Sequence, residues 1–284
     1  MAGTSTVTTE NASTVAALQM TSGNDRDANL ATAERLLQAA AARGARVAVL
    51  PENFSLMALR DADRRAHAEV DGTGPVQDFL ARTAARLGIW IIAGSVPLAQ
   101  ASGERNAQAC LVYNSQGGRA ARYDKIHLFD VELPDRAESY RESATMAPGD
   151  QVVAVDTPAG RLGLSICYDL RFPELYRRLE AAGAQWLIVP AAFTATTGAA
   201  HWEPLLRARA IENLCYVVAS AQWGTHPNGR QTWGHSLIVD YWGRILTQLA
   251  EGEGVVTAAI DLDAQAAARR KFPTLTHRVA QLNG

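Results

Sequence analysis

Three side chains that could act together in catalysis each stand directly after a short strand-like run of the sequence: Glu52, Lys125 and Cys167. Active sites of layered α/β folds are built at strand ends. Taken singly, each residue has a structural alternative, namely a solvated glutamate, a surface lysine and a buried core thiol. The prediction of a site therefore rests on the three residues together.

The chemistry that these groups support is acyl transfer through sulfur. A thiolate can attack an acyl carbon and form a thioester. No histidine lies in an obvious position to activate Cys167, so a carboxylate must take the proton, and Glu52 could do so if burial raises its pKa toward neutrality. Lys125 would stabilise the tetrahedral oxyanion together with the backbone N–H of Tyr168, and its ammonium would lower the pKa of the thiol.

The sequence around Cys167 predicts that it lies on a strand-to-helix turn. Residues 162–166 are short and apolar, as in a buried strand, and Pro173 followed by helix formers predicts a helix start. We therefore expect the sulfur to lie near helix N-terminal N–H groups, which stabilise a thiolate.

Strand-like and helix-like segments alternate along the chain, which indicates an α/β layered fold. Expected strands are residues 15–20, 46–51, 89–96, 108–114, 118–124, 152–155, 162–166, 186–190, 216–220, 236–239, 245–248 and 255–260; expected helices are 25–43, 76–87, 175–182, 203–212 and 264–271. Hairpin signals at 115–118, 157–160 and 240–244 require antiparallel pairs. A mixed sheet, or two face-to-face sheets with helices outside, fits both patterns. Residues 126–149 lack periodicity and are expected to form a long, functional loop.

Composition limits the classes of function. The chain has 284 residues, of which 48% are hydrophobic and 20% charged, with a formal net charge of −2. We expect a loose tail over residues 1–13, without the features of a signal peptide, and a single domain over 14–284. With no cluster of basic residues and no apolar run of membrane-spanning length, we expect neither nucleic acid nor a membrane as partner.

The cysteines and histidines argue against a disulfide framework and against a metal site. Three cysteines stand far apart, and the six histidines form no His-x-His or His-x-x-x-His pair. We therefore expect no metal and no cofactor, and a reducing, cytoplasmic location in which a free thiol survives.

Three segments of the chain resemble the signature segments of the nitrilase superfamily of carbon–nitrogen hydrolases, in the family's order and spacing. They are Pro51-Glu52-Asn53, Tyr123-Asp-Lys-Ile-His-Leu-Phe-Asp130 and Ser165-Ile-Cys-Tyr-Asp-Leu-Arg-Phe-Pro-Glu174. The resemblance, over about residues 15–278, implies that Glu52 is the general base, Lys125 the oxyanion stabiliser and Cys167 the nucleophile. It also implies a second glutamate, Glu142, that orients Lys125 or the substrate nitrogen. The implied fold is a four-layer αββα sandwich of two mixed sheets flanked by helices. Because the family usually forms dimers, we expect a homodimer or a higher homo-oligomer.

The branch of the superfamily is indicated by residues after the nucleophile. Tyr168-Asp169 looks like the amidase side, because nitrilases have Trp-Glu there, and residues 193–212 are similar to the Nit proteins. This resemblance implies hydrolysis of deaminated glutathione to 2-oxoglutarate and cysteinylglycine, a metabolite repair reaction. The alternatives are an ω-amidase for 2-oxoglutaramate, an N-carbamoyl amino-acid hydrolase, and a binding scaffold without activity.

We expect a small-molecule amide substrate that carries a carboxylate. Arg171 could bind that carboxylate bidentately, as an arginine does in related carbamoyl amino-acid hydrolases, or could form a structural ion pair with Asp169 or Glu174. His201 could line the pocket or cap a helix above a core tryptophan. Weaker expectations for the pocket wall are Phe54, Phe193 and Thr194.

Overall fold

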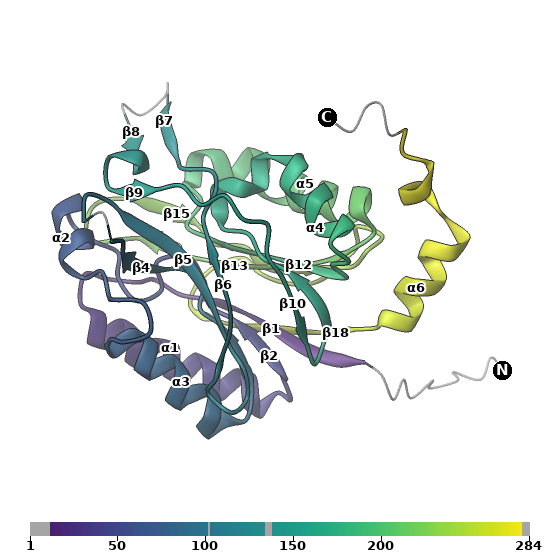
Figure 1. The fold of residues 1–284 in the computed structure, drawn as a ribbon, viewed down its shortest axis with the longest axis horizontal. Coiled ribbons are helices and arrows are strands. Elements are labelled where there is room, and N and C mark those ends of the chain that lie inside the picture. Colours follow the sequence, from purple (N-terminus) through teal and green to yellow (C-terminus); the bar gives the residue numbers. More distant parts are fainter. Residues whose placement is uncertain (1–11, 102, 134–137, 280–284) are drawn as a thin grey trace.

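Two face-to-face sheets form the centre of the molecule in the computed structural model, which describes residues 12–101, 103–133 and 138–279 (Figure 1). The first sheet has eight strands. Its order is β18 (Gly254–Ile260), β1 (Ser13–Gln19), β2 (Val47–Val49), β3 (Trp90–Ile92), β5 (Asn106–Tyr113) and β4 (Val96–Ala99), and β6 (Arg119–Asp124) and β9 (Met146–Ala147) also pair with β5. Strands β1, β2 and β3 are parallel, and β6 returns antiparallel to β5 through the predicted hairpin.

The second sheet has six strands, in the order β10 (Ala154–Thr157), β11 (Gly160–Gly163), β12 (Trp186–Ala191), β13 (Tyr216–Ala221), β16 (Ser236–Val239) and β17 (Ile245–Leu249). Its centre is parallel and its two edges are antiparallel hairpins. Two further hairpins stand apart from both sheets: β7 (Asp130–Leu133) with β8 (Glu138–Arg141), and β14 (Trp223–Thr225) with β15 (Gln231–Trp233).

Helices cover the outer face of each sheet. Because side chains alternate across a strand, Val15 and Ala17 of β1 face the second sheet, whereas Ala16 and Leu18 pack in the cluster that contains α1 and α3. Helices α1 (Arg26–Ala42) and α3 (Pro75–Leu87) cover the first sheet, and α4 (Pro173–Ala181) and α5 (Ala195–Asn213) cover the second (Figure 1). The predicted four-layer αββα sandwich of two mixed sheets is confirmed.

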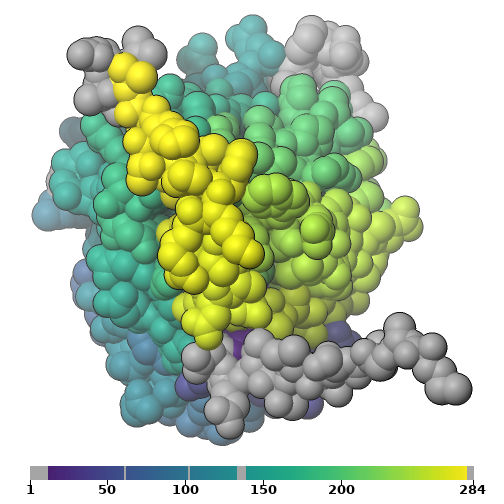
Figure 2. Space-filling model, turned by 90° about the vertical axis from the view of Figure 1, so that its right-hand side faces the viewer, coloured from purple at the N-terminus to yellow at the C-terminus, as the bar shows by residue number. Residues whose placement is uncertain are grey.

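The remaining helical segments are α2 (Asp61–Ala66), α6 (Leu262–Lys271) and the 3₁₀ turns η1 (Glu142–Ala144), η2 (Cys167–Arg171) and η3 (Thr274–His277). Helix α6 lies across the outside of the molecule (Figure 2). Its Gln265 amide donates to the carbonyls of Gln185 (2.6 Å) and Leu214 (2.8 Å), which fixes the helix to loops of the second sheet.

Strand β3 is shorter than the sequence predicts, and the cause is Gly94. Residues 89–96 were expected to form one strand, but β3 ends at Ile92 and β4 begins at Val96. Gly94 has a φ of +57°, and a Cβ there would lie 2.1 Å from the carbonyl oxygen of Pro51. Glycine thus lets the chain turn against the segment that leads directly into Glu52.

Residues 126–149 do not form the predicted loop. They contain the β7–β8 hairpin, η1 and β9, so this prediction was wrong. The segment has charged residues on a small two-stranded ribbon outside the main sheets, and it therefore lacks the apolar alternation on which strand prediction depends.

Helix α5 begins earlier than predicted, at Ala195 rather than near Glu203. The side chain of Thr194 caps it by accepting from the N–H of Thr197 (3.3 Å). Threonine and glycine in the first turns have weak helix propensity, which hid the start of this helix.

Residues 1–11 of the predicted tail lie outside the described residues, and Ser13 already belongs to β1. Among the helices that the structure describes, none combines the length and apolar character that crossing a membrane requires.

Candidate active site

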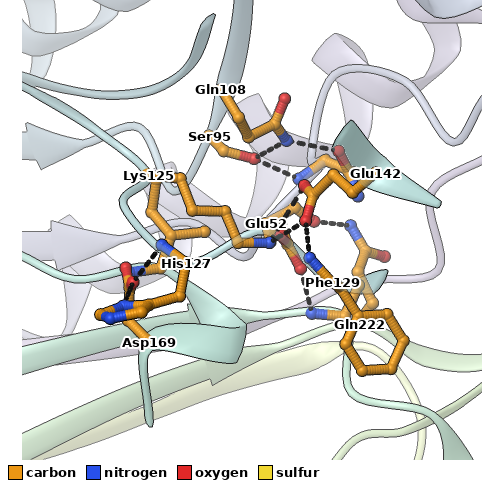
Figure 3. A network of polar contacts seen from close by, with 12 residues as sticks. Glu52, Ser95, Gln108, Lys125, His127, Phe129, Glu142, Asp169 and Gln222 are labelled. Carbon is orange, nitrogen blue, oxygen red and sulfur yellow. Dashed lines mark hydrogen bonds and ion pairs between the residues drawn. The ribbon is translucent and has the colours of Figure 1, made fainter. Parts of the chain in front are cut away.

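Lys125 joins the two glutamates that the sequence singled out. Its Nζ donates to Glu52 Oε1 (2.9 Å) and to both carboxylate oxygens of Glu142 (3.0 and 2.8 Å; Figure 3). The Lys125 and Glu52 side chains are only 2% and 4% exposed. A buried ammonium between two buried carboxylates is stable because each charge has a partner.

Glu52 is held at both its backbone and its carboxylate. It follows β2 through Leu50 and Pro51, and its Oε2 accepts from the N–H of Ala192 (2.9 Å), at the end of β12 in the other sheet. The Gln222 side chain donates to the Glu52 carbonyl (3.0 Å). Both sheets therefore fix this carboxylate, and little motion is left to it.

Asn53, the residue after Glu52, adopts a left-handed conformation with a φ of 58°. Its N–H donates to Ser95 Oγ (2.9 Å), and the Gln108 amide donates to Asn53 Oδ1 (2.8 Å) and Ser95 Oγ (2.7 Å; Figure 3). The carbonyl of Gln108 accepts from the N–H of Lys125 (2.9 Å). One buried network therefore sets the position of Glu52 relative to Lys125.

Cys167 opens the turn η2 with a left-handed φ of 47°, and it lines the same pocket as Glu52. Strand β11 ends at Gly163, three residues earlier than expected, and α4 begins at Pro173 as predicted. The thiol thus lies between strand and helix. The structure brings Glu52, Lys125, Cys167 and Glu142 together at one point.

Asp169 connects the turn that carries Cys167 to the strand end that carries Lys125. Its carboxylate accepts from the N–H of Ile166 (2.8 Å), the hydroxyl of Tyr123 (2.7 Å) and the N–H of His127 (3.1 Å). His127 also bonds to Asp169 through Nδ1 (2.7 Å) and stacks on Phe172, with ring centroids 3.7 Å apart. These residues lie within the signature segments, but no local pattern in the sequence indicates this positioning role.

The charge pairing sets the protonation states of the site. Burial acts to raise the pKa of Glu52, but the charge and hydrogen bond of Lys125 outweigh it, and the pKa lies below its ordinary value of 4.5. The two glutamates likewise overcome desolvation and raise the pKa of Lys125. Glu52 is therefore an anion at neutral pH, in contrast to the pKa raised toward neutrality that burial alone would give.

The pKa of the Cys167 thiol is raised in this site, whereas the sequence favoured a lowered pKa and a thiolate. Burial raises its pKa well above 9.0, the negative charge of Glu52 raises it further, and Lys125 opposes both only in part. At neutral pH the raised pKa favours a neutral thiol beside the Glu52 carboxylate, which is placed to accept the proton.

A pocket opens over Cys167 and contains about 720 Å³ of space including its mouth, a size suited to a small molecule. Of the predicted contacts, Tyr168, Arg171, Phe193 and Thr194 line it. Tyr168 is the second residue of η2, so its N–H has no partner within the turn and can serve an oxyanion.

Two predicted contacts lie elsewhere. Phe54 is fully buried in the core beneath α1 and α3, because the left-handed Asn53 redirects the chain after Glu52. His201 is exposed on α5, and its Nδ1 lies 3.2 Å from the Arg171 guanidinium.

The predicted alternative for Arg171, an ion pair with Asp169 or Glu174, is not formed among the described residues. Arg171 instead lies over the ring of Phe193, 5.1 Å from its centroid. Pocket residues that sequence reasoning missed are Asn53, Arg64, Phe129, Ser139, Tyr140, Arg141, Ala192, Thr197 and Arg230.

Within the described ranges, histidine, cysteine, aspartate and glutamate side chains form no group of three or more that could hold a metal ion. Around one open space, the site brings together two carboxylates, an ammonium and a thiol.

An αββα sandwich with such a site defines a class of hydrolases that cleave carbon–nitrogen bonds. The family model named carbon-nitrogen hydrolase matches residues 14–270. A deaminated glutathione amidase of Yersinia enterocolitica is 44% identical over 264 residues, which cover 93% of this chain and 92% of the relative. The human protein of the same name is 41% identical, over 95% of this chain and 83% of its own length.

A solved structure leads to the same family. Nit3 of Saccharomyces cerevisiae, described as a member of branch 10 of the nitrilase superfamily, has a TM-score of 0.83 and 30% identity, covering 93% of this chain and 95% of that one. The chain belongs to the carbon–nitrogen hydrolase family of the nitrilase superfamily, and it is an amidase that acts on a small-molecule amide.

Proposed function

We propose that this amidase hydrolyses deaminated glutathione, an ω-amide of 2-oxoglutarate, to 2-oxoglutarate and cysteinylglycine. The observation that carries the proposal is the contact of Lys125 with both Glu52 and Glu142 beside the Cys167 thiol. The relatives that bear this name, at 41–44% identity over most of their length, support the substrate.

In the first half of the reaction the thiol proton passes to Glu52 while sulfur attacks the amide carbon. The C=O π bond opens, and the resulting oxyanion is stabilised by the Lys125 ammonium and the N–H of Tyr168. Glu52 then gives its proton to the amide nitrogen, the C–N bond breaks and cysteinylglycine leaves. The product of this half is a thioester between Cys167 and the 2-oxoglutaryl group.

In the second half a water molecule gives a proton to Glu52 and attacks the thioester carbon. The same donors stabilise the second oxyanion, the C–S bond breaks, and the proton on Glu52 returns to sulfur. The low pKa of Glu52 suits this cycle, because the carboxylate must be ionised at the start of each half.

We assign two further residues to this reaction. Glu142 holds the Lys125 ammonium in place with two hydrogen bonds while Glu52 changes charge. Arg171, on the same turn as the nucleophile, binds the carboxylate of the 2-oxo acid portion. Its guanidinium has no carboxylate partner among the described residues, which suits that task.

We also infer a single domain over residues 14–284, a homodimer, and a cytoplasmic location. The superfamily resemblance supports the dimer, and Ile211 on α5 is 50% exposed on a surface that a second copy could cover. The three cysteines are free, which suits a reducing compartment. Sedimentation analysis of the purified chain checks the dimer.

A substrate panel tests the proposed function. Release of amine or ammonia is measured from deaminated glutathione, 2-oxoglutaramate and N-carbamoyl amino acids under the same conditions. We expect the highest kcat/KM for deaminated glutathione. A higher kcat/KM for 2-oxoglutaramate would make the chain an ω-amidase, and turnover of none of them would favour a scaffold.

A further inference from the structure

The wall of the pocket carries positive charge that the catalytic groups do not use. Besides Lys125, the lining residues include Arg64, Arg141, Arg171 and Arg230. The lining carboxylates are Glu52 and Glu142, and both are bonded to Lys125. The pocket therefore has an excess of positive charge around the space left for substrate, and one bound carboxylate would not balance it.

Arg230 lies next to the general base. The carbonyl of Ala192 accepts a hydrogen bond from Arg230 Nη2, and the N–H of Ala192 donates to Glu52 Oε2 (2.9 Å). The guanidinium is close enough that its charge helps to lower the pKa of Glu52. A single residue thus separates the carboxylate that protonates the leaving nitrogen from the Arg230 guanidinium.

The guanidinium of Arg230 is held in one orientation, but not all of its N–H groups have a hydrogen-bond acceptor. Its Cζ lies 5.1 Å from the centroid of the Tyr140 ring, and its Nη2 donates to the carbonyl of Ala192. Its Nε is buried and has no hydrogen-bond partner within the described part of the chain, and the same is true of Arg64 Nε on another part of the wall. A buried N–H without a partner is costly, so a substrate oxygen that accepts from it is favoured.

The turn that carries Arg230 is fixed before substrate arrives. Its N–H donates to Asn228 Oδ1 (3.0 Å), whose amide in turn donates to the carbonyl of Ala58 (2.9 Å). The His226 ring lies 2.9 Å from the carbonyl of Ser22 and 2.8 Å from the hydroxyl of Thr232. A guanidinium that is already held in place loses little conformational entropy when it binds a carboxylate.

We propose that Arg230 binds a carboxylate on the leaving amine, so that the enzyme selects amides with an anionic group on each side of the scissile bond. This inference rests on the proposed function, because it takes Glu52 as the group that protonates the leaving nitrogen. Substituents on that nitrogen must extend from Glu52 into the space beside it, where Arg230 lies. The two residues of cysteinylglycine span at most about 7 Å, a reach suited to this wall of the pocket.

Two substrates that differ in one group test the inference. They are deaminated glutathione and its analogue in which the terminal carboxylate is a primary amide. The measured quantity is the ratio of their kcat/KM values. We expect Arg230→Met to lower kcat/KM for the carboxylate substrate about 10- to 100-fold more than for the analogue, the usual worth of a hydrogen-bonded charge. Compared with Arg230→Met, Arg230→Lys restores part of the ratio, because lysine supplies the positive charge but not the two parallel N–H donors of the guanidinium.

Two further variants separate recognition from other effects. Arg171→Met lowers kcat/KM for both substrates by a similar factor, since the acyl portion is common to them. Arg244→Met, at an exposed position outside the active-site pocket, leaves the ratio at its wild-type value. A change in the pKa of Glu52 affects both substrates alike, so the ratio isolates the contact with the carboxylate.

The outcomes that overturn the inference are distinct from those that overturn the proposed function. If Arg230→Met lowers kcat/KM by the same factor for both substrates, or changes it for neither, Arg230 is not a recognition residue and the proposed function stands. If the wild-type chain releases no cysteinylglycine from deaminated glutathione, the proposed function and this inference fall together.

Discussion

Charged side chains are paired in one part of the pocket and unpaired in another. We call Glu52, Lys125 and Glu142 the floor of the pocket, and Arg171 and Arg230 its wall. At the floor, Lys125 is bonded to Glu52 and Glu142, and all three side chains are at most 10% exposed. On the wall, Arg171 and Arg230 have no carboxylate partner among the described residues, and each guanidinium lies over an aromatic ring. Each charge on the floor is bonded to an opposite charge without substrate, whereas the two wall guanidinium groups have no such bond among the described residues.

This difference separates two tasks. Groups that take part in bond making have to be held at fixed distances, so the fold supplies all their partners. Groups that recognise a ligand need donors left over, so the fold supplies orientation and leaves the counter-charge to the substrate. Substitutions at the floor should therefore affect kcat and stability, and substitutions on the wall should affect selectivity.

Removal of the Cys167 thiol, the proposed nucleophile, should produce the largest effect. We expect Cys167→Ala to lower kcat by a factor on the order of 10⁵ or more, as loss of a nucleophile does in other hydrolases. The fold should survive, because only one small side chain is lost. Product release and circular dichroism of the variant check both statements, and a variant with even a tenth of the wild-type rate would contradict the role of sulfur.

Loss of the Lys125 ammonium should affect both kcat and the free energy of unfolding. Lys125→Met leaves two buried carboxylates facing each other without a counter-charge. We expect it to cost about 3–5 kcal/mol in the free energy of unfolding and about 10²–10³ in kcat. Urea denaturation and steady-state kinetics measure the two quantities.

Arg171→Met is the matched control for Lys125→Met, because it removes the same charge from the wall. Its unfolding free energy should stay within about 0.5 kcal/mol of wild type. An equal destabilisation by both substitutions would remove the distinction between floor and wall.

Glu142→Gln should have an intermediate effect at the floor. The amide keeps the shape of the carboxylate but supplies no negative charge, and it also weakens the bond from the Phe129 N–H, now 2.7 Å. We expect kcat to fall about 10- to 100-fold with KM nearly unchanged, as for an interaction made mainly in the transition state. A raised KM at constant kcat would instead make Glu142 a binding residue.

The pH profile should show the smallest but most specific effect. The active state is ionised Glu52 with a neutral Cys167 thiol. The pKa of Glu52 lies below 4.5 and that of Cys167 well above 9.0, so activity should be lost only as pH falls below about 4.5 or rises beyond 9.0. In a plot of kcat/KM against pH, an acid limb near pH 6–7 would contradict the strong pairing of Glu52 with Lys125.

The positions of Glu52, Lys125 and Cys167 could be predicted from the sequence because each follows a strand, and strand ends converge in layered folds. Glu142 could be placed only through the family resemblance, since its segment has no periodicity. The protonation states could not be predicted, because they depend on the balance between burial and the Lys125 charge, which only the packed structure sets.

The substrate contacts show where pattern reading fails. Phe54 stands two residues from Glu52, yet the left-handed Asn53 sends its side chain into the core. Arg230 lies on a short turn between β14 and β15, which the sequence analysis did not predict, and it reaches the site only through folding over a separation of 178 residues from Glu52. Such contacts carry no local signal.

The central claim is that Cys167 carries a thioester that forms before water attacks. Deaminated glutathione and 2-oxoglutaramate share the 2-oxoglutaryl group and differ in the leaving amine, so both would form the same acyl-enzyme. With methanol present as a competing acceptor, the ratio of 2-oxoglutarate methyl ester to 2-oxoglutarate should be identical for the two substrates. A ratio that changes with the leaving amine would contradict a common thioester and favour direct attack by water.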